Sequence, residues 1–177
     1  MEEFLRIRLG DCKYNHQSKC AHPSPYVILD SPNIFITDPG GEFPVKIALE
    51  DHDAHLAVSN PNGTTVCVVK TDNCLFNDDT KKCDCFVFSN DKFYSVEIKE
   101  NSSGNRNKKR NKAVEQLTAT FEFLIRSGID LSPYEVKAII CFSRNDQYPI
   151  RASSNSQRAI FQSRFNASLE EGNVITI

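Results

Sequence analysis

The feature that most constrains the fold of this chain is a change of sequence pattern near residue 100. Before it, short runs rich in β-branched and aromatic residues are separated by turn sequences, whereas after it apolar residues recur at every third or fourth position. The first pattern predicts β-strands and the second an amphipathic helix, because side chains repeat every two residues in a strand and about every 3.6 in a helix. We therefore expect an α+β domain with an α/β core, in which a helix crosses a mixed β-sheet.

Three hairpins are predicted in the first part of the chain. Their strands and turns are residues 33–37 and 43–49 around Asp-Pro-Gly-Gly, residues 56–59 and 64–70 around Asn-Pro-Asn-Gly, and residues 85–88 and 93–98 around Ser-Asn-Asp. Glycine, asparagine and aspartate tolerate the positive φ angles that tight turns require. Residues 1–30 contain Pro23 and Pro25 and no sustained periodicity, so we expect them to be irregular.

The second part of the chain predicts a helix and a buried strand. Apolar residues at helical spacing predict a helix over residues 112–126, and the apolar run 136–142 predicts a strand buried on both faces. Residues 101–111 lack apolar side chains and are expected to form a surface loop, and a last helix is expected over residues 156–169. A length of 177 residues suits one domain, so we assign residues 1–177 to a single domain.

Charge and hydropathy limit the partners and the cellular location that we expect for this protein. The net charge of −2 excludes uniform attraction to a polyanion, so contact with nucleic acid would depend on clustered cations. One cluster of cations is present, formed by Arg106, Lys108, Lys109, Arg110 and Lys112. It could grip phosphates, or it could simply keep a solvated loop soluble. Without a membrane-length apolar stretch or a signal peptide, the protein is expected to be cytoplasmic, with no membrane association.

The seven cysteines offer a second kind of site. An odd count without a signal peptide indicates a reducing compartment, and no structural disulfide is expected. Cys12, His16, Cys20 and His22 supply four ligand types that a structural Zn²⁺ ion can use. Their spacing is not a standard zinc spacing, and the alternative is a polar loop with two buried thiols. A zinc-stabilised interaction module therefore stays open as one function.

The third predicted hairpin carries the chemically informative residues. Asp84 precedes its first strand, and Glu97 and Lys99 lie on one face of its second strand because they are two residues apart. Pairing across the turn is expected to bring the carboxylates of Asp84 and Glu97 together, where they repel unless a cation lies between them. A hard ion such as Mg²⁺ or Mn²⁺ takes oxygen ligands and joins carboxylates to a substrate phosphate. The pattern predicts a metal site for phosphodiester hydrolysis.

Asp84 followed by Glu97-Ile98-Lys99 on the next strand resembles the PD-(D/E)XK, or restriction-endonuclease-like, nuclease superfamily. The resemblance covers about residues 64–145, since a helix and a buried strand follow in the order that this core requires. Gln116, early in that helix, is similar to a glutamine that exonuclease-like members place beside the metal. Cys83 stands in place of the name-giving proline, and no leading helix with an acidic ligand is identified. Glu50 and Asp72 are the candidates for that further acid.

The resemblance implies a function and partners. It implies a nuclease dependent on Mg²⁺ or Mn²⁺, with Asp84 and Glu97 as metal ligands and Lys99 and Gln116 as further catalytic residues. DNA is favoured over RNA as the substrate. Small members of this superfamily often belong to restriction or anti-phage defence systems, which implies a larger protein partner, and cleavage of both strands of a duplex implies a homodimer. An inactive nuclease fold that binds nucleic acid or a protein is the remaining alternative.

Overall fold

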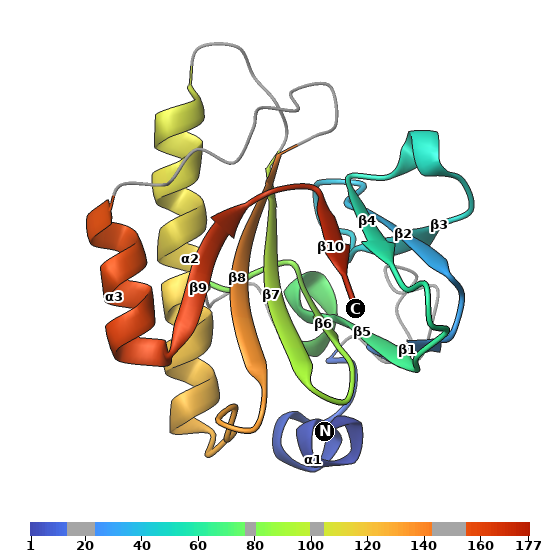
Figure 1. The fold of residues 1–177 in the computed structure, drawn as a ribbon, viewed down its shortest axis with the longest axis horizontal. Helices are drawn as coiled ribbons and strands as arrows, with labels where there is room; N and C mark the ends of the chain where they lie inside the picture. Colours follow the sequence, from blue (N-terminus) through green and yellow to red (C-terminus); the bar gives the residue numbers. More distant parts are fainter. Residues whose placement is uncertain (14–23, 77–80, 100–104, 143–154) are drawn as a thin grey trace.

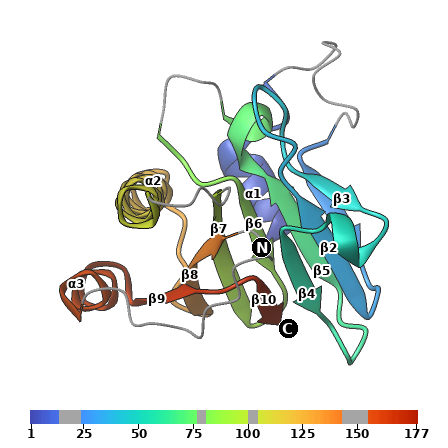
Figure 2. The same cartoon turned by 90° about the horizontal axis from the view of Figure 1, so that it is seen from above.

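The computed structural model describes residues 1–13, 24–76, 81–99, 105–142 and 155–177. In chain order its elements are α1 (Glu2–Leu9), β1 (Tyr26–Leu29), β2 (Asn33–Thr37), β3 (Lys46–Ala48), η1 (Asp51–Asp53), β4 (Leu56–Ser59), β5 (Val66–Lys70), η2 (Thr71–Leu75), β6 (Cys85–Phe88), β7 (Lys92–Lys99), α2 (Arg106–Arg126), β8 (Glu135–Phe142), α3 (Asn155–Phe165), β9 (Ala167–Glu171) and β10 (Val174–Thr176). They form three layers, with α2 and α3 on one side of a large sheet and a smaller sheet on the other (Figures 1 and 2). The α+β class with mixed sheets is as predicted.

The large sheet of the described residues has six strands in the order β1-β5-β6-β7-β8-β9. Strand β5 is antiparallel to β1 and β6, and β6 is antiparallel to β7, whereas β8 is parallel to both β7 and β9. Parallel neighbours need a long crossover, and α2 supplies it between β7 and β8. The predicted hairpin of β6 and β7 is confirmed, with Cys85 opposite Val96 and Phe88 opposite Phe93.

The small sheet contains β10, β4, β2 and β3 in that order. The predicted hairpin of β2 and β3 is confirmed. The hairpin predicted for residues 56–59 and 64–70 is wrong, because β4 belongs to the small sheet and β5 to the large one. All five residues of β5 are buried, which suits a strand between two neighbours in the large sheet. The intervening turn holds the buried Asn60, whose Oδ1 accepts the backbone N–H of Thr64 at 2.9 Å.

Two apolar cores cover the two faces of the large sheet. One contains Phe93 and Phe86 from the sheet with Phe121 and Leu117 from α2, and the other contains Val96 and residues of the small sheet. Strand β7 therefore alternates between the two sides, as a strand buried on both faces must. The odd-numbered residues of β7 face the helices. The side chains of Glu97 and Lys99 therefore lie in a mostly apolar layer between the sheet and the helices.

Several boundaries differ from the sequence predictions. Residues 1–30 are not irregular throughout, because α1 buries Leu5 and Leu9, one helical turn apart, and β1 pairs with β5. Helix α2 begins at Arg106, so the predicted loop of residues 101–111 is helical from that residue on. Helix α3 ends at Phe165, and Asn166 adopts a positive φ of 49° before β9 begins. Strand β9 pairs with β8 where the last helix was expected to continue.

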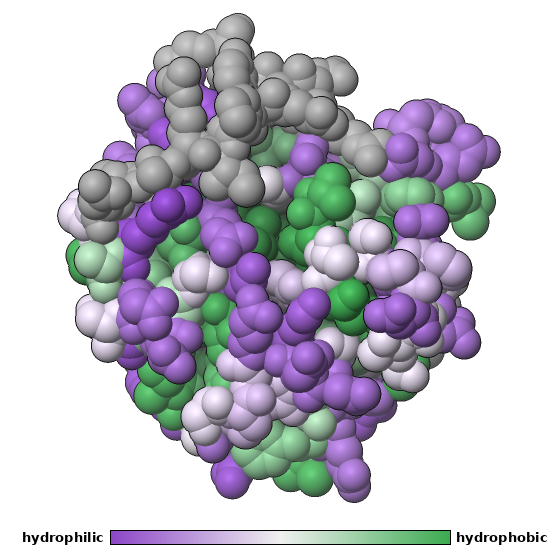
Figure 3. All heavy atoms as spheres, in the orientation of Figure 1, coloured by the Kyte–Doolittle hydropathy of each residue, from purple (hydrophilic) through white to green (hydrophobic). Residues whose placement is uncertain are grey.

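The surface is mixed in character. In the orientation of Figure 1, hydrophilic residues are spread across the visible face and apolar residues form only small patches (Figure 3). Among the helices of the described residues, none has the length and hydrophobicity required to cross a membrane.

Candidate active site

The residues that the sequence analysis selected gather at one end of the β6–β7 hairpin, against α2. Asp84 directly precedes β6, and Glu97 and Lys99 lie in the last three residues of β7. Because the two strands are antiparallel, the start of one lies beside the end of the other. Gln116 reaches this place from α2, where its Oε1 accepts a 3.0 Å hydrogen bond from the Lys99 ammonium. The structure thus brings these four residues to one site.

Glu97 is the most constrained member of the site. Its side chain is 0% exposed, and its Oε1 accepts a hydrogen bond from the Lys99 ammonium. Its buried Oε2 has no hydrogen-bond partner among the described residues. Burial raises the pKa of Glu97 well above its ordinary value, the charge of Asp84 raises it further, and Lys99 lowers it. The carboxyl group therefore lacks a second partner, which a proton or a cation would supply.

The carboxylate of Asp84 is held by the backbone of β7. Its Oδ2 accepts the N–H of Ile98 at 2.5 Å, and its own N–H donates to the carbonyl of Val96 at 3.0 Å. Asp84 directly precedes β6, and its carboxylate takes the place of a backbone carbonyl as the acceptor for the Ile98 N–H of β7. Burial raises the pKa of Asp84 to about 7, the Ile98 N–H lowers it, and the charge of Asp38 raises it.

Helix α2 fixes the segment that leads into Asp84 through two hydrogen bonds. Gln116 Nε2 donates to the carbonyl of Lys82 at 3.0 Å, and Thr120 Oγ1 accepts the N–H of Cys83 at 2.8 Å. These two helix residues are four positions apart and therefore lie on the same side of α2. Gln116 consequently joins the Lys99 ammonium to the backbone just before Asp84, which explains why both sides of the site are held by one helix.

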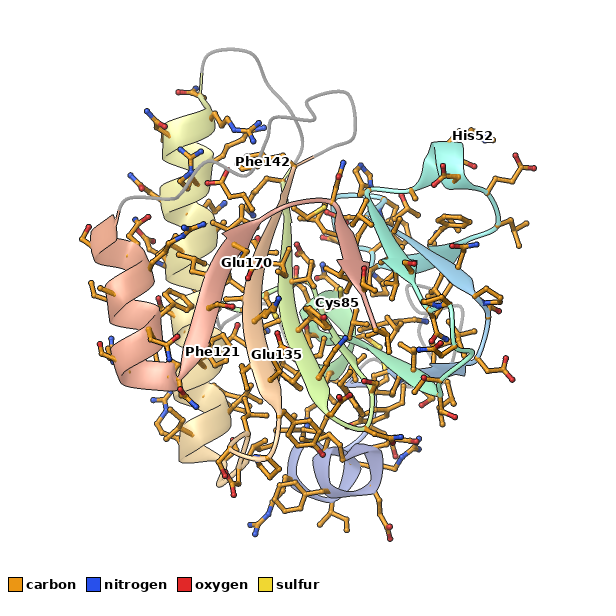
Figure 4. The ribbon with its side chains drawn as sticks, in the orientation of Figure 1. His52, Cys85, Phe121, Glu135, Phe142 and Glu170 are labelled. Carbon is orange, nitrogen blue, oxygen red and sulfur yellow. The ribbon has the colours of Figure 1, made fainter. Side chains whose placement is uncertain are left out.

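The candidates for a further acid fall in different places. Asp72 lies near the site, because its charge raises the pKa of both Asp84 and Glu97. Glu50 directly precedes η1 and forms an exposed contact at 3.1 Å with His52 of η1, which lies at the outer edge of the small sheet (Figure 4). A helix that the sequence analysis did not identify, α1, precedes the strands of the large sheet. Its Glu2 pairs with Arg6 at 2.8 Å within that helix.

Asp38 is a neighbour of the site that the sequence analysis did not select. It lies in the turn between β2 and β3, and its Oδ1 accepts the N–H of Gly40 at 2.9 Å. Its charge is the largest charged contribution that raises the pKa of Asp84. The Asp-Pro-Gly-Gly sequence indicates a turn, and nothing in it signals that the turn approaches the large sheet.

The five clustered cations do not act alike. Arg110 forms a bidentate pair with the buried Glu171 of β9, and Arg106 contacts the same carboxylate at 3.5 Å. The Arg106 guanidinium also lies 3.9 Å from the ring centroid of Phe142, at the end of β8 (Figure 4). Lys108 and Lys112 instead line a cavity of about 700 Å³ together with Gln116. Lys109 is partly exposed and lies on α2 between the arginines that contact Glu171 and the lysines that line the cavity.

The cysteine and histidine set of the sequence analysis is described only at Cys12, which is buried. His16, Cys20 and His22 lie outside the described residues. The six described cysteines are free and buried. In the ranges that the structure describes, no three His, Cys, Asp or Glu side chains are grouped so as to hold a metal ion. A metal at the hairpin would therefore have Asp84 and Glu97 as its protein ligands, a number that Mg²⁺ commonly accepts alongside water and phosphate.

Comparison of the chain with protein-family models, with curated proteins and with solved structures finds no match. The side chains at the end of the β6–β7 hairpin, and the chemistry that they permit, are therefore the basis for inferring a function.

Proposed function

We propose that the protein is a metal-dependent nuclease that hydrolyses phosphodiester bonds, with DNA as the favoured substrate. Asp84 and Glu97 would hold Mg²⁺ or Mn²⁺, and Lys99 and Gln116 would act beside it. The observation that carries this proposal is the buried, unpartnered Oε2 of Glu97 next to a second buried carboxylate. Two such groups in an apolar layer are costly to keep charged unless a cation accompanies them.

The donor set fits a hard divalent cation. Carboxylate oxygens are the ligands that such ions prefer, and Mg²⁺ is commonly held by one or two carboxylates plus the phosphates of a substrate. When bound, the ion would stabilise negative charge on the phosphate and lower the pKa of a water ligand. The Ile98 N–H already orients Asp84, Gln116 orients Lys99, and Lys99 in turn orients Glu97, so little reorganisation would be needed on binding.

The protein's own residues have separate tasks in this proposal. Lys99 exposes 15% of its side chain, and its ammonium has three donors, two of which go to Glu97 and Gln116. The third donor is available for the attacking water or for negative charge developing on the phosphate. Gln116 positions Lys99, and the Ile98 N–H positions Asp84.

The order of elements supports the same proposal. The hairpin with Asp84 and Glu97-Ile98-Lys99 is followed by α2 and by β8, which runs parallel to β7. This is the order that the resemblance to the PD-(D/E)XK superfamily led us to expect. Helix α1 precedes these strands and packs Leu5 and Leu9 into the core on the helix side of the large sheet. A larger defence-system partner and a homodimer remain part of the proposal that rests on the resemblance alone.

Cleavage assays with site variants test the proposal. Wild-type protein, Asp84→Asn and Glu97→Gln are incubated with DNA and RNA substrates and Mn²⁺. The exposed Asp30, between β1 and β2, supplies the matched control Asp30→Asn. We expect at least a roughly hundredfold loss of rate in the site variants and none in the control, because removing one strong electrostatic contact typically costs that much. Equal rates in all four proteins would refute the proposal, and metal-independent binding without cleavage would support the inactive-fold alternative.

A further inference from the structure

A groove runs along α2 past the candidate active site. It consists of two cavities, of about 700 Å³ and about 100 Å³, that share Lys81 and Lys82 as lining residues. Helix α2 forms one wall of both cavities. Gln116 lines the larger cavity, so the groove passes the residue that contacts Lys99.

The helix wall of the groove is one continuous face. Lys108, Lys112, Gln116, Thr120 and Phe123 line it at steps of three or four residues, which keeps them on the same side of a helix. The lining extends from Lys108 to Arg126. At a rise of about 1.5 Å per residue, this wall is about 27 Å long. A groove of this length can accommodate several units of an extended polymer.

The charge of the groove differs in sign from that of the whole chain. Among its described lining residues are five cations, namely Lys81, Lys82, Lys108, Lys112 and Arg126, and two carboxylates, Asp72 and Glu115. The chain as a whole has a net charge of −2. Within the described part of the chain, Lys108 and Lys112 are exposed and form no ion pair. Local excess of cations along a groove is the electrostatic pattern of a phosphate-binding track.

The position of these lysines on α2 strengthens this interpretation. The first turn of α2 contains no acidic residue, although the amino end of a helix is favourable for anions and unfavourable for cations. Lys108, which lies in this first turn, therefore reduces the stability of the helix while it increases the attraction of the helix for an anion. A polyanion in the groove would benefit from both the ammonium groups and the amino end of α2.

The end of the groove nearest the carboxyl end of α2 is lined by aromatic side chains. The small cavity is lined by Phe76 and Phe123, whose rings meet edge to face with centroids 4.9 Å apart. The Lys82 ammonium lies 5.2 Å from the centroid of the Phe76 ring. The volume of this cavity is of the order of apolar cavities that accept one six-membered ring. Aromatic side chains beside cations are the combination that binds unpaired bases and their phosphates.

We propose that this groove binds a single-stranded polynucleotide, with phosphates on the lysines and one unpaired base against Phe123. This inference rests on the proposed function and specifies its substrate class. A base in a duplex is stacked and paired, so it could not enter the small cavity without leaving its partner. The groove therefore selects a single strand, or a frayed end, and leads it towards Lys99.

Binding measurements without metal test this inference separately from cleavage. Fluorescence anisotropy in EDTA follows a labelled twelve-nucleotide oligothymidylate, the matching oligouridylate and a twelve-base-pair DNA duplex. The two single strands decide between DNA and RNA. We expect the preferred single strand to bind at least about tenfold more tightly than the duplex, because stacking contributes only when bases are unpaired.

Variants assign the binding to the groove. Phe123→Leu keeps an apolar side chain and should weaken single-strand binding roughly tenfold. The pair Lys108→Gln and Lys112→Gln, both at exposed positions, should lower the slope of log K against log salt by about 1.4. Lys46→Gln on β3, where the lysine lies over Phe43 away from α2, is the control.

These binding measurements can either support or contradict the inference. A single-strand preference that is lost in the groove variants and kept in the control confirms the inference, even if Mn²⁺-dependent cleavage is never observed. Equal or tighter binding of the duplex, absence of binding, or groove variants that behave like Lys46→Gln would overturn it. None of these outcomes depends on the cleavage assay, so the two proposals can fail independently.

Discussion

The Lys99 ammonium donates a 3.0 Å hydrogen bond to Gln116 Oε1, which joins the end of strand β7 to helix α2. Because the other end of this amide donates to the backbone before Asp84, one side chain orients both the cation and the neighbouring acid. This arrangement gives the helix a direct influence on the chemistry of the hairpin.

Replacing Gln116 by alanine should separate positioning from folding. In Gln116→Ala the Lys99 ammonium keeps only its contact with Glu97, so we expect the cleavage rate to fall about tenfold or more. The lost hydrogen bonds should lower the free energy of unfolding by about 1–2 kcal/mol. Glu122→Ala, on the same helix but outside the groove, removes an exposed ion pair with Arg164 and serves as the control. An equal loss of rate in both variants would contradict a positioning role.

The stability of the metal-free protein should fall with increasing pH. Burial raises the pKa of Asp84 from its ordinary value of 3.8 to about 7, so the folded state holds this proton more tightly than the unfolded state. Its stabilising contribution is therefore complete at about pH 4 and is lost as the pH rises through about 7, by at most about 4 kcal/mol. Glu97, whose pKa is also raised, acts in the same direction.

Urea unfolding in EDTA between about pH 4 and pH 8 measures this dependence. Asp84→Asn should flatten the profile, and the exposed control Asp30→Asn should leave it unchanged. A stability difference between wild type and Asp84→Asn that does not change with pH would contradict the raised pKa of Asp84.

Divalent metal should stabilise the folded protein. At a concentration of about one hundred times Kd, a ligand that binds only the folded state contributes about 2.7 kcal/mol, which corresponds to a rise in Tm of roughly 5–10 °C. We expect this rise with Mn²⁺ at pH 8 and a smaller one at pH 6, where Asp84 with its pKa of about 7 is largely protonated. Glu97→Gln should abolish the shift. The same Tm increase in that variant would place the ion elsewhere.

The pair of Arg110 and Glu171 should matter more for stability than an exposed ion pair. Glu171 is 6% exposed and Arg110 19% exposed, so Glu171→Gln leaves partly buried guanidinium groups without their carboxylate. We expect the free energy of unfolding to fall by about 2 kcal/mol or more. Glu122→Gln breaks the exposed pair with Arg164 and should cost at most about 1 kcal/mol. Chemical denaturation of both variants measures the difference, and equal losses would rule out this ranking.

Elements with a strong local pattern were predictable. The apolar period of residues 112–126 predicted the later part of α2, and the apolar run 136–142 predicted β8. The β2–β3 and β6–β7 hairpins were predictable because a tight turn holds neighbouring strands together. The polar residues 106–111 concealed the start of α2, since part of what stabilises that turn is Glu171, which is distant in sequence.

Pairings between distant segments were not predictable from the sequence. The turn at residues 60–63 indicates a change of direction, but only the burial of β5 between β1 and β6 shows that it joins two sheets. Strands β9 and β10 are short, and in the sequence they lie far from their partners β8 and β4. Their hydrogen bonds arise from packing across the domain, which local propensity does not encode.

For the candidate site, the amino-acid sequence by itself determined the chemical groups and their order: an acid before one strand, an acid and a lysine at the end of the next, and a glutamine on the following helix. Only the tertiary structure decided that Glu97 Oε2 is buried without a partner, that Gln116 contacts Lys99 and that Arg110 is neutralised by Glu171. The physical reason is that the sequence specifies which side chains can ionise or bind, whereas desolvation and the choice of partner depend on which segments the fold packs against them.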